Sequence, residues 1–492
     1  MTSILKLSAF EIARAIKKKE ISPLEAVQTH IDYVEKVNPN INAVVEKLYD
    51  EALALAKIQT EQIARLNAQA IADLPQLFGV PFTIKEMIAH KGSRRTGGSY
   101  HKKDAVMDFD GSIVQRMKAA GAIPIATTNV PELGFWVECY NAIYGMTNNP
   151  HNNSHTPGGS SGGEAALIAA GASPFGLGSD IGGSIRMPSA FCGIYGHKPS
   201  NRIVPITGHF PYAIEDIRKL KGGKYPYTTL GPMARKAQDL YPLLKLMIGP
   251  DGVDQETLND FKLKERSKNF SQVKVYYISA PEIFLARGAS AEVSETVELV
   301  AQYFKDLGCK TEALRADVFS KAGLYWSSAL KSTKEKTFEQ NLTNEKGLFF
   351  IKEIVAMGFK KSIYTFPSLG ISAMERMLGF IKKKDSSAIL LELENKIKEI
   401  NSLLGDNAVL IMPTFPSVAP KHYHAIFRPL DFLYTAIVNA LQMPATSAHV
   451  RMNKKGLPIG VQIVGAQFND HLTLACAEEI EKGFAGWQAP LG

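Results

Sequence analysis

Hydrophobic residues near the N-terminus recur at helical spacing. One stripe, with gaps of three and four residues, consists of Leu24, Val27, Ile31 and Val34. Such a stripe predicts a helix with one buried face. Two capping boxes, in which a serine and a glutamate satisfy backbone N–H groups at a helix start, are Ser8 with Glu11 and Ser22 with Glu25. Together with a following stretch rich in Ala, Leu and Glu, they predict N-terminal helices over residues 1–70.

After residue 70 the pattern changes to short apolar runs. Residues 78–84 form a strand-like run, and Pro81 within it predicts an edge position because proline cannot donate to a sheet. A helical segment at 112–121 and an apolar run at 122–126 complete a strand–helix–strand alternation. This alternation is typical of a layered α/β fold. Further elements are expected near the C-terminus, with strands at 408–412 and 460–465 and a helix at about 470–484.

Amphipathic helical patterns dominate the stretch from 261 to 404, most clearly at 283–306 and 371–404. No internal repeat interrupts the chain. Length alone would suggest two or three domains, but the pattern favours a single domain over residues 1–492, in which one α/β core carries a helical insert. Its expected parts are N-terminal helices at 1–70, a catalytic core at 71–260, a helical insert or substrate cap at 261–404, and the C-terminal part of the core at 405–492.

Composition excludes several functional classes. The net charge of +8 is mild for 492 residues, and the basic clusters are short, so nucleic-acid binding is not expected. The four cysteines lie far apart without a C-x-x-C pair, which argues against a disulfide framework and favours a reducing compartment. No signal peptide and no run of about 20 apolar residues is visible, so we expect a cytoplasmic protein.

Three short segments carry candidate chemistry: GVPFTIKE at 79–86, GGSSGGE at 158–164 and GSDIGGSIR at 178–186. In the first, Lys85 follows an apolar run. A lysine that points into the protein loses part of its basicity, and the neutral amine can then act as a general base. The alternative is a lysine at a strand end whose ammonium group reaches solvent.

The two glycine-rich segments suggest a loop that holds an oxyanion. Consecutive N–H groups from Ile181 to Ser184 have few steric obstacles and can form a nest for developing negative charge, with Ser184 placed to attack. Ser160 lies in a loop that leads into a helix starting near Glu164, where the helix dipole is positive. Taken singly, the two segments also fit a flexible linker and a tight turn.

One competing motif overlaps the second segment. Residues 159–163 match G-x-S-x-G, the nucleophile elbow of α/β-hydrolases, which would make Ser161 the nucleophile with His449 or His471 as base. That elbow requires a strand directly before it, and the preceding residues are a poor strand. His422 and His424 have no further ligand in a motif, and no phosphate-binding loop is present, so neither a metal nor a cofactor is expected.

With all three segments in order, the sequence resembles the amidase signature family. The resemblance covers most of the chain and is densest from 81 to 200. It returns at 231–235, 412–414 and 457–462. Residues 184–199 are most similar to the fatty acid amide hydrolases, particularly the second vertebrate type and its bacterial relatives. The resemblance implies an α/β fold with a mixed central β-sheet flanked by α-helices.

The resemblance also implies a mechanism without a cofactor. Ser184 takes the place of the nucleophile, Ser160 that of the bridging serine after a cis peptide, and Lys85 that of the buried base. An acyl-enzyme then forms and is hydrolysed by water. The implied oxyanion-binding residues are Ile181, Gly182, Gly183 and Ser184; the supporting residues are Ser161, Asp180 and Arg186; the acyl-channel residues are Gly134, Phe135 and Trp136.

The expected function is a serine amidohydrolase acting on small apolar acyl or aryl amides, with esters and carbamates left open. The alternative is an A-type amidotransferase subunit that releases ammonia from glutamine for a partner, and a third is an inactive binding module. An apolar stretch at 348–359 beside Lys360 and Lys361 is consistent either with peripheral membrane contact or with a core helix. A homodimer stays open.

Overall fold

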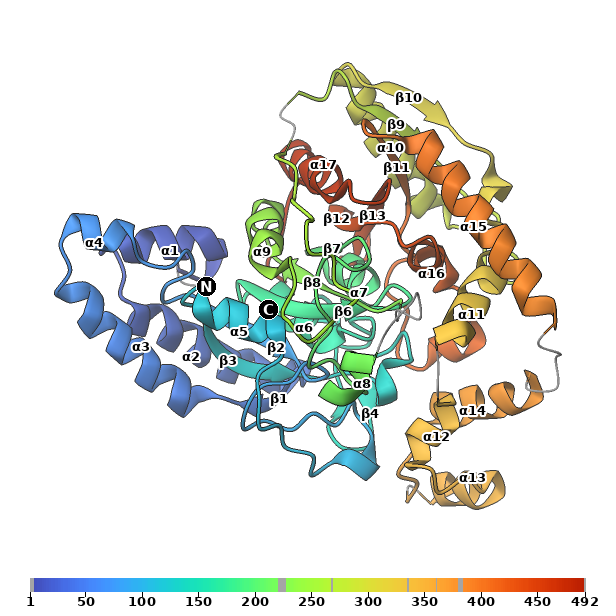
Figure 1. Ribbon diagram of the computed structural model, residues 1–492, viewed down its shortest axis with the longest axis horizontal. Coiled ribbons are helices and arrows are strands. Elements are labelled where there is room, and N and C mark those ends of the chain that lie inside the picture. Colours follow the sequence, from blue (N-terminus) through green and yellow to red (C-terminus); the bar gives the residue numbers. More distant parts are fainter. Residues whose placement is uncertain are drawn as a thin grey trace.

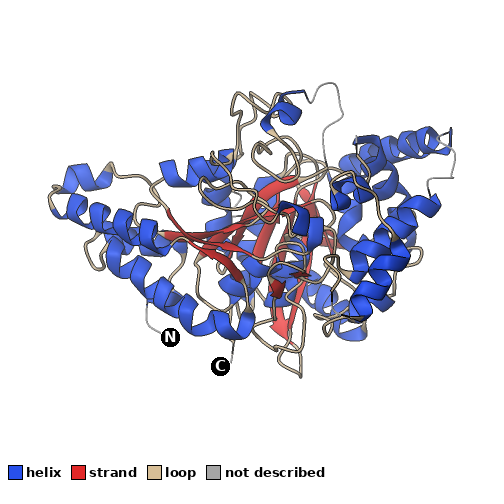
Figure 2. Cartoon of the chain, turned by 90° about the horizontal axis from the view of Figure 1, so that it is seen from below, coloured by secondary structure: helices blue, strands red, loops and turns tan. Residues whose placement is uncertain are grey.

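A computed structural model describes residues 4–219, 227–266, 269–333, 336–359, 361–378 and 384–490. An 11-stranded sheet crosses the described chain, with helices on both of its faces (Figures 1 and 2). The strands lie in the order β1 (Val44–Lys47), β3 (Ile123–Thr128), β2 (Pro81–Lys85), β6 (Phe175–Asp180), β8 (Thr229–Ala234), β7 (Tyr195–Lys198), β12 (Ala445–Met452), β13 (Pro458–Gly465), β11 (Ala408–Pro413), β9 (Lys274–Tyr277) and β10 (Lys310–Ala313).

The sheet is mixed, as the family resemblance implied. β2 pairs in parallel with β3 and β6, and β9 pairs in parallel with β10 and β11. The other neighbouring strands are antiparallel. Parallel pairs require long crossovers, which explains why helices separate these strands along the chain.

Alternation along the strands divides the core between the two faces. Val275 and Val409 face one apolar cluster, which includes residues of α10 (Ala291–Asp306) and α17 (Asp470–Gly483). Their neighbours Tyr276 and Leu410 face the other cluster, which includes residues of α11 (Ala322–Thr333), α15 (Lys384–Leu404) and α16 (Leu433–Ala440). Successive side chains of a strand point to opposite faces, so these strands contribute to both layers.

The N-terminal helices begin where the sequence predicted. Ser8 forms the full capping box with Glu11 at the start of α1 (Ala9–Lys17), and Ser22 caps α2 (Pro23–Ile41) by accepting from the Glu25 N–H. Two more helices, α3 (Tyr49–Ala64) and α4 (Ala68–Ala72), complete this end of the molecule. Figure 1 shows α1–α4 beyond the β1 edge of the sheet.

Two expectations about strands were wrong. β2 is not an edge strand, because it lies between β3 and β6. Pro81 is tolerated there because it is the first residue of the strand. The stretch from 261 to 404 is not wholly helical, since β9 and β10 belong to the central sheet. Both are only four residues long, too short to show a period-two pattern against the helices around them.

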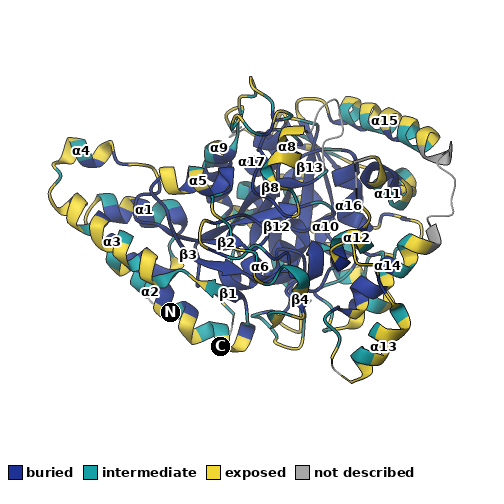
Figure 3. Ribbon diagram, turned by 60° about the horizontal axis from the view of Figure 1, so that its bottom comes forward, coloured by how far each residue is buried: buried dark blue, intermediate teal, exposed yellow. Residues whose placement is uncertain are grey.

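A small group of helices stands away from the sheet. It comprises α12 (Phe338–Thr343), α13 (Phe350–Gly358) and α14 (Phe366–Leu378), and we call it the cap. Figure 3 shows that α13 is largely exposed. Within the described part of the chain, no helix is both long enough and apolar enough to cross a membrane.

The remaining helices surround the middle of the sheet. They are α5 (Ser112–Ala119), α6 (Gly162–Ala169), α7 (Arg186–Cys192), α8 (Ile214–Lys219) and α9 (Leu240–Met247). Both α6 and α7 are buried along their whole length. The loops before them are the two glycine-rich segments, so the fold brings these loops to one place beside the end of β2.

Candidate functional site

A cavity of about 460 Å³ opens beside the glycine-rich loops. Ser160, Ser179 and Ser184 all line it, together with His209. Ser179 lies near the end of β6, Ser160 precedes α6, and Ser184 precedes α7. Segments distant in the sequence therefore present four hydrogen-bonding side chains to one enclosed space.

Lys85 is the last residue of β2 and is fully buried. Phe82 and Ile84 pack into the core on one face of the strand, so alternation directs Lys85 to the opposite face. Its Nζ lies 2.7 Å from Ser160 Oγ, 2.9 Å from Ser179 Oγ and 3.3 Å from the Ser179 carbonyl oxygen. Burial lowers the pKa of Lys85 to about 7, so a substantial fraction of the amine is neutral at neutral pH.

The peptide between Gly159 and Ser160 is cis, as the family resemblance implied. The carbonyl of Trp136 lies only 2.3 Å from where a Cβ on Gly159 would be, so no side chain fits at that position. Ser160 itself is 3% exposed, and its Oγ is hydrogen-bonded to Lys85 Nζ. The loop thus aims a buried hydroxyl at a buried amine.

Ser161 faces a different direction. Its hydroxyl donates to the Ser179 carbonyl at 3.3 Å and accepts from the Ser179 N–H at 3.4 Å, and it is absent from the residues that line the described cavity. Residues 156–161 form no strand, and the ring nitrogens of His449 have no hydrogen-bond partner among the described residues. This geometry supports a bracing role for Ser161 and argues against the nucleophile elbow.

The turn that carries Ser184 requires glycine at position 183. Gly183 has a φ of +120°, and a Cβ there would lie 2.0 Å from Thr435 Oγ1. The carbonyl of Ser184 accepts from the Ser161 N–H at 3.1 Å, which joins the two loops. The hydroxyls of Ser184 and Ser160 share the cavity, and the described hydrogen bonds include none between them. Catalytic hydrogen bonds are commonly long without substrate.

The four N–H groups expected to bind an oxyanion are not equivalent. The Gly183 N–H donates to Asp180 Oδ1 at 2.7 Å and is therefore already engaged. In the described chain, the N–H groups of Ile181, Gly182 and Ser184 donate to no backbone or side-chain acceptor. These three remain available to a developing negative charge.

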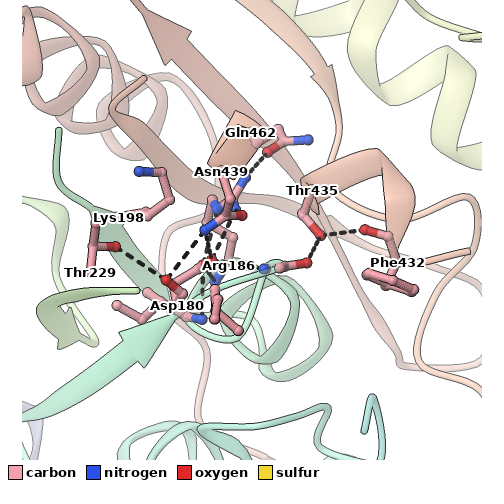
Figure 4. A network of polar contacts seen from close by, with 12 residues as sticks. Asp180, Arg186, Lys198, Thr229, Phe432, Thr435, Asn439 and Gln462 are labelled. Carbon is pink, nitrogen blue, oxygen red and sulfur yellow. Dashed lines mark hydrogen bonds and ion pairs between the residues drawn. The ribbon is translucent and has the colours of Figure 1, made fainter. Parts of the chain in front are cut away.

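Asp180 and Arg186 form a buried ion pair that holds this turn (Figure 4). Arg186 Nη2 donates to Asp180 Oδ1 at 3.0 Å and Nε donates to Oδ2 at 3.1 Å. Burial alone would raise the pKa of Asp180, but the charge and hydrogen bonds of Arg186 outweigh it and hold the pKa far below its usual value. The carboxylate is therefore ionised, and it also accepts from the Ile185 N–H.

Three residues that the sequence analysis did not assign to the site complete this network. Asn439 of α16 donates to Asp180 and accepts from Arg186 at 2.6 Å, and Gln462 of β13 accepts from Arg186 at 2.7 Å. Thr435 donates to the Gly182 carbonyl at 2.7 Å. An amide in the mostly apolar helix segment LYTAIVNA was the one sequence signal for Asn439.

The predicted acyl-channel residues divide between two places. Gly134 and Phe135 line the cavity, Trp136 is not among the residues that line it, and a substrate-binding role for these residues stays a prediction. Trp136 packs instead against a separate cluster that contains Met187 and Phe191. The turn that precedes Phe135 and Trp136 is irregular, with positive φ at Leu133 and Gly134.

Among the described residues, no cluster of three or more His, Cys, Asp or Glu side chains could hold a metal ion. The four cysteines are free and buried. Beside the glycine-rich loops, the polar groups of the cavity include the hydroxyls of Ser160, Ser179 and Ser184, which suit acyl transfer through a serine.

Comparison of the sequence with known proteins identifies its family. The profile of the family described as Amidase matches residues 25–474. The chain belongs to the amidase family. Human fatty-acid amide hydrolase 2 is 35% identical to this amidase, over 99% of this chain and 91% of its own. A glutamyl-tRNA(Gln) amidotransferase subunit of Lachnoclostridium phytofermentans is 30% identical, over 97% of each chain.

A solved structure supports the same fold. A bacterial aryl acylamidase of the amidase signature family superposes on this amidase with a TM-score of 0.78 and 24% sequence identity, and the match covers 99% of this chain and 98% of the other. The family match and these relatives show that the protein is a serine amidohydrolase, an enzyme that hydrolyses amide bonds.

The Asp180–Arg186 pair should dominate the stability of the site. Arg186→Met leaves a buried carboxylate without its counter-charge, and we expect the free energy of unfolding to fall by about 3–5 kcal/mol. Urea denaturation followed by fluorescence measures the change. Asp180→Asn combined with Arg186→Met removes both charges and should lose less than the sum of the single changes. Full additivity would show that the two residues act independently.

Proposed function

We propose that this amidase hydrolyses apolar acyl amides with Ser184 as nucleophile, Ser160 as bridging proton carrier and Lys85 as base. The observation that carries the proposal is the buried Lys85 amine, hydrogen-bonded to Ser160 at 2.7 Å in a cavity that Ser184 also lines. An amine with a pKa of about 7 is a suitable base near neutral pH.

The proton path follows from these contacts. As Ser184 Oγ attacks the amide carbonyl carbon, its proton passes to Ser160, whose own proton passes to Lys85 Nζ. The carbonyl oxygen becomes an oxyanion that Ile181, Gly182 and Ser184 can bind through their N–H groups. Collapse of the tetrahedral intermediate breaks the C–N bond, and the leaving amine takes the proton back through Ser160.

The second half of the reaction repeats these steps with water. Water attacks the Ser184 ester, its proton moves through Ser160 to Lys85, and the carboxylic acid leaves as Ser184 is protonated again. Asp180 and Arg186 take no proton in this scheme. They hold the turn on which the nucleophile and the three free N–H groups stand.

The cavity walls favour an apolar acyl group. They include Met87, Leu133, Phe135, Phe210 and Phe338. These side chains belong to one apolar cluster that extends into the cap. The similarity to human fatty-acid amide hydrolase 2 supports the same substrate class, and aryl amides, esters and carbamates would enter by the same chemistry.

The amidotransferase alternative shares the loops but is less well supported. Identity to the amidotransferase subunit is 30%, against 35% for the fatty-acid amide hydrolase. Glutamine is small and polar, whereas the wall formed by Met87, Leu133, Phe135, Phe210 and Phe338 suits an apolar acyl group. Turnover of an acyl amide by the isolated chain would decide for the hydrolase.

The cap carries a surface suited to a lipid interface. Phe349, Ile351, Ile354 and Phe359 are between 60% and 82% exposed along α13 and its flanks. Lys346 and Lys361, both exposed, flank α13 and would attract anionic headgroups, whereas Lys360 lies outside the described residues. We propose that this face meets a membrane that holds the substrate, since Phe350 packs in the same cluster as the cavity residue Phe135.

Fluorophosphonate labelling tests the nucleophile. We expect intact-protein mass to show one adduct on the wild type and on Ser161→Ala, and none on Ser184→Ala, because only Ser184 stands in reach of the relay and the oxyanion-binding groups. An adduct lost in Ser161→Ala but kept in Ser184→Ala would establish the elbow instead.

The relay predicts a specific pH dependence. Only neutral Lys85 accepts a proton, so kcat/KM should rise with pH through about 7 and level above it. Lys85→Ala should lower kcat/KM by about a hundredfold or more and abolish the rise. Glu164→Gln is the matched control, because burial raises the pKa of Glu164 to about 8 and this residue could otherwise produce such a limb. If Glu164→Gln abolished the rise of kcat/KM with pH, the titration would belong to Glu164 and not to Lys85.

Vesicle flotation tests the exposed face of α13. Wild type should float with phosphatidylcholine–phosphatidylserine vesicles at low salt, and Ile351→Ser with Phe359→Ser should reduce binding more than tenfold, because each buried side chain contributes about 1.5–3 kcal/mol. The matched control is Phe284→Ser with Leu285→Ser, which changes two equally apolar side chains, 71% and 68% exposed, outside the cap. Equal losses in both variants would contradict a specific docking face.

A further inference from the structure

His209 reaches the site from a loop between β7 and α8. This loop is hydrogen-bonded to the segment that follows Lys85 in the sequence. Ala89 donates its N–H to the Gly208 carbonyl at 2.9 Å, and Phe210 donates its N–H to the Met87 carbonyl at 2.8 Å. These bonds fix the backbone on both sides of His209. Its side chain is 4% exposed and lines the cavity.

One hydrogen bond links His209 to the relay. Nε2 lies 2.8 Å from Ser179 Oγ, the same oxygen that lies 2.9 Å from Lys85 Nζ. Among the described residues, Nδ1 has no hydrogen-bond partner, so the contact with Ser179 orients the ring. His209, Ser179 and Lys85 therefore form a side branch that meets the proton path at the lysine.

The branch matters because neutral Lys85 has two N–H donors and one lone pair. A base must keep its lone pair toward the Ser160 hydroxyl, which leaves the two N–H groups for the other partners. The Ser179 carbonyl can only accept, and it takes one of them at 3.3 Å. The other must go to Ser179 Oγ, and the Ser179 hydroxyl proton must then point away from the lysine.

We infer that His209 Nε2 accepts the Ser179 hydroxyl proton and thereby reserves the Lys85 lone pair for Ser160. His209 is then a positioning residue, and the inference rests on the proposed role of Lys85 as base. Without an acceptor at Nε2, the Ser179 hydroxyl could donate to Lys85 and occupy the lone pair that Ser160 needs. No proton leaves the branch during turnover.

The charges around His209 favour the neutral ring that this role requires. Burial lowers its pKa well below the usual value, and the nearby cations Lys85 and Arg95 lower it further, while the Phe210 backbone acts in the opposite direction. Arg95 donates to the carbonyl of Gly208, next to His209. A protonated ring would donate to Ser179 and turn its hydroxyl toward Lys85, which would block the base.

The remaining titratable groups lie along the other walls of the cavity. They are Lys102, Tyr212, Asp216, Lys219, Lys336 and Glu345. None of these six appears among the groups that shift the pKa of His209. A change of pH near neutrality should therefore titrate Lys85 while His209 stays neutral.

The test compares His209→Leu with His209→Gln on the full-length enzyme. Leucine removes the acceptor, so the plateau of kcat/KM should fall about tenfold, the effect of one misdirected hydrogen bond. The rise of kcat/KM with pH should stay at the same pH or move to lower pH. The Ser179 hydroxyl would then donate a hydrogen bond to Lys85, and this bond stabilises the neutral amine. Glutamine offers an amide oxygen near the position of Nε2 and should recover most of the plateau.

A double-variant cycle separates positioning from a general structural role. Ser179→Ala removes the competing hydroxyl and lowers activity by itself, but in that background His209→Leu should change kcat/KM less than about twofold. An equal loss with and without the Ser179 hydroxyl would overturn the inference, as would a Leu variant with wild-type kinetics.

Fluorophosphonate labelling keeps this result separate from the proposed function. If wild type fails to label at Ser184, the relay itself is wrong. If wild type labels at Ser184 and His209→Leu labels at the same rate across neutral pH, the relay stands and the role of His209 is refuted. Slower labelling in His209→Leu, with recovery in His209→Gln, supports both.

Discussion

The site depends on the burial of an amine that has no counter-ion of its own. Among the acidic groups whose charge raises the pKa of Lys85, Asp180 has the largest effect, but its carboxylate is already paired with Arg186. The buried acids Glu86 and Glu164 also influence Lys85, but burial raises their pKa values to about 7 and about 8. Desolvation therefore prevails over attraction, and the lysine is held near the point where it gains or loses a proton.

The Asp180–Arg186 ion pair connects the site to the C-terminal part of the chain. Asp180 and Arg186 lie at the turn before α7, yet their polar partners Asn439 and Gln462 come from the C-terminal part of the chain. A buried carboxylate and guanidinium require several hydrogen bonds to offset their desolvation. Because α16 and β13 supply these bonds, the C-terminal part of the chain helps to hold the turn that carries Ser184.

Sequence reasoning succeeded where chemistry depends on a contiguous segment. The loops around Ser160 and Ser184 are defined by glycines that the local backbone requires, so their neighbours could be read from the motif. It failed for contacts made across the sheet, such as Asn439, Thr435 and His209, because a single polar residue in an apolar or loop segment does not specify its partner. Trp136 adjoins Phe135 in the sequence but packs in a different apolar cluster, a division that a motif of neighbouring residues does not specify.

A relay of neutral groups has an advantage that an ionic one lacks. The base must take a proton from the nucleophile and return it to a leaving amine within one catalytic cycle. If Lys85 were beside a free carboxylate, the lysinium form would be stabilised and the return step would become the slower one. With Asp180 committed to Arg186, the proton on Lys85 has only hydroxyl and carbonyl neighbours within hydrogen-bonding distance among the described residues. In the proposed relay, the direction of transfer depends on which hydroxyl donates to Lys85, so the inferred orientation of the Ser179 hydroxyl would matter as much as the identity of the base.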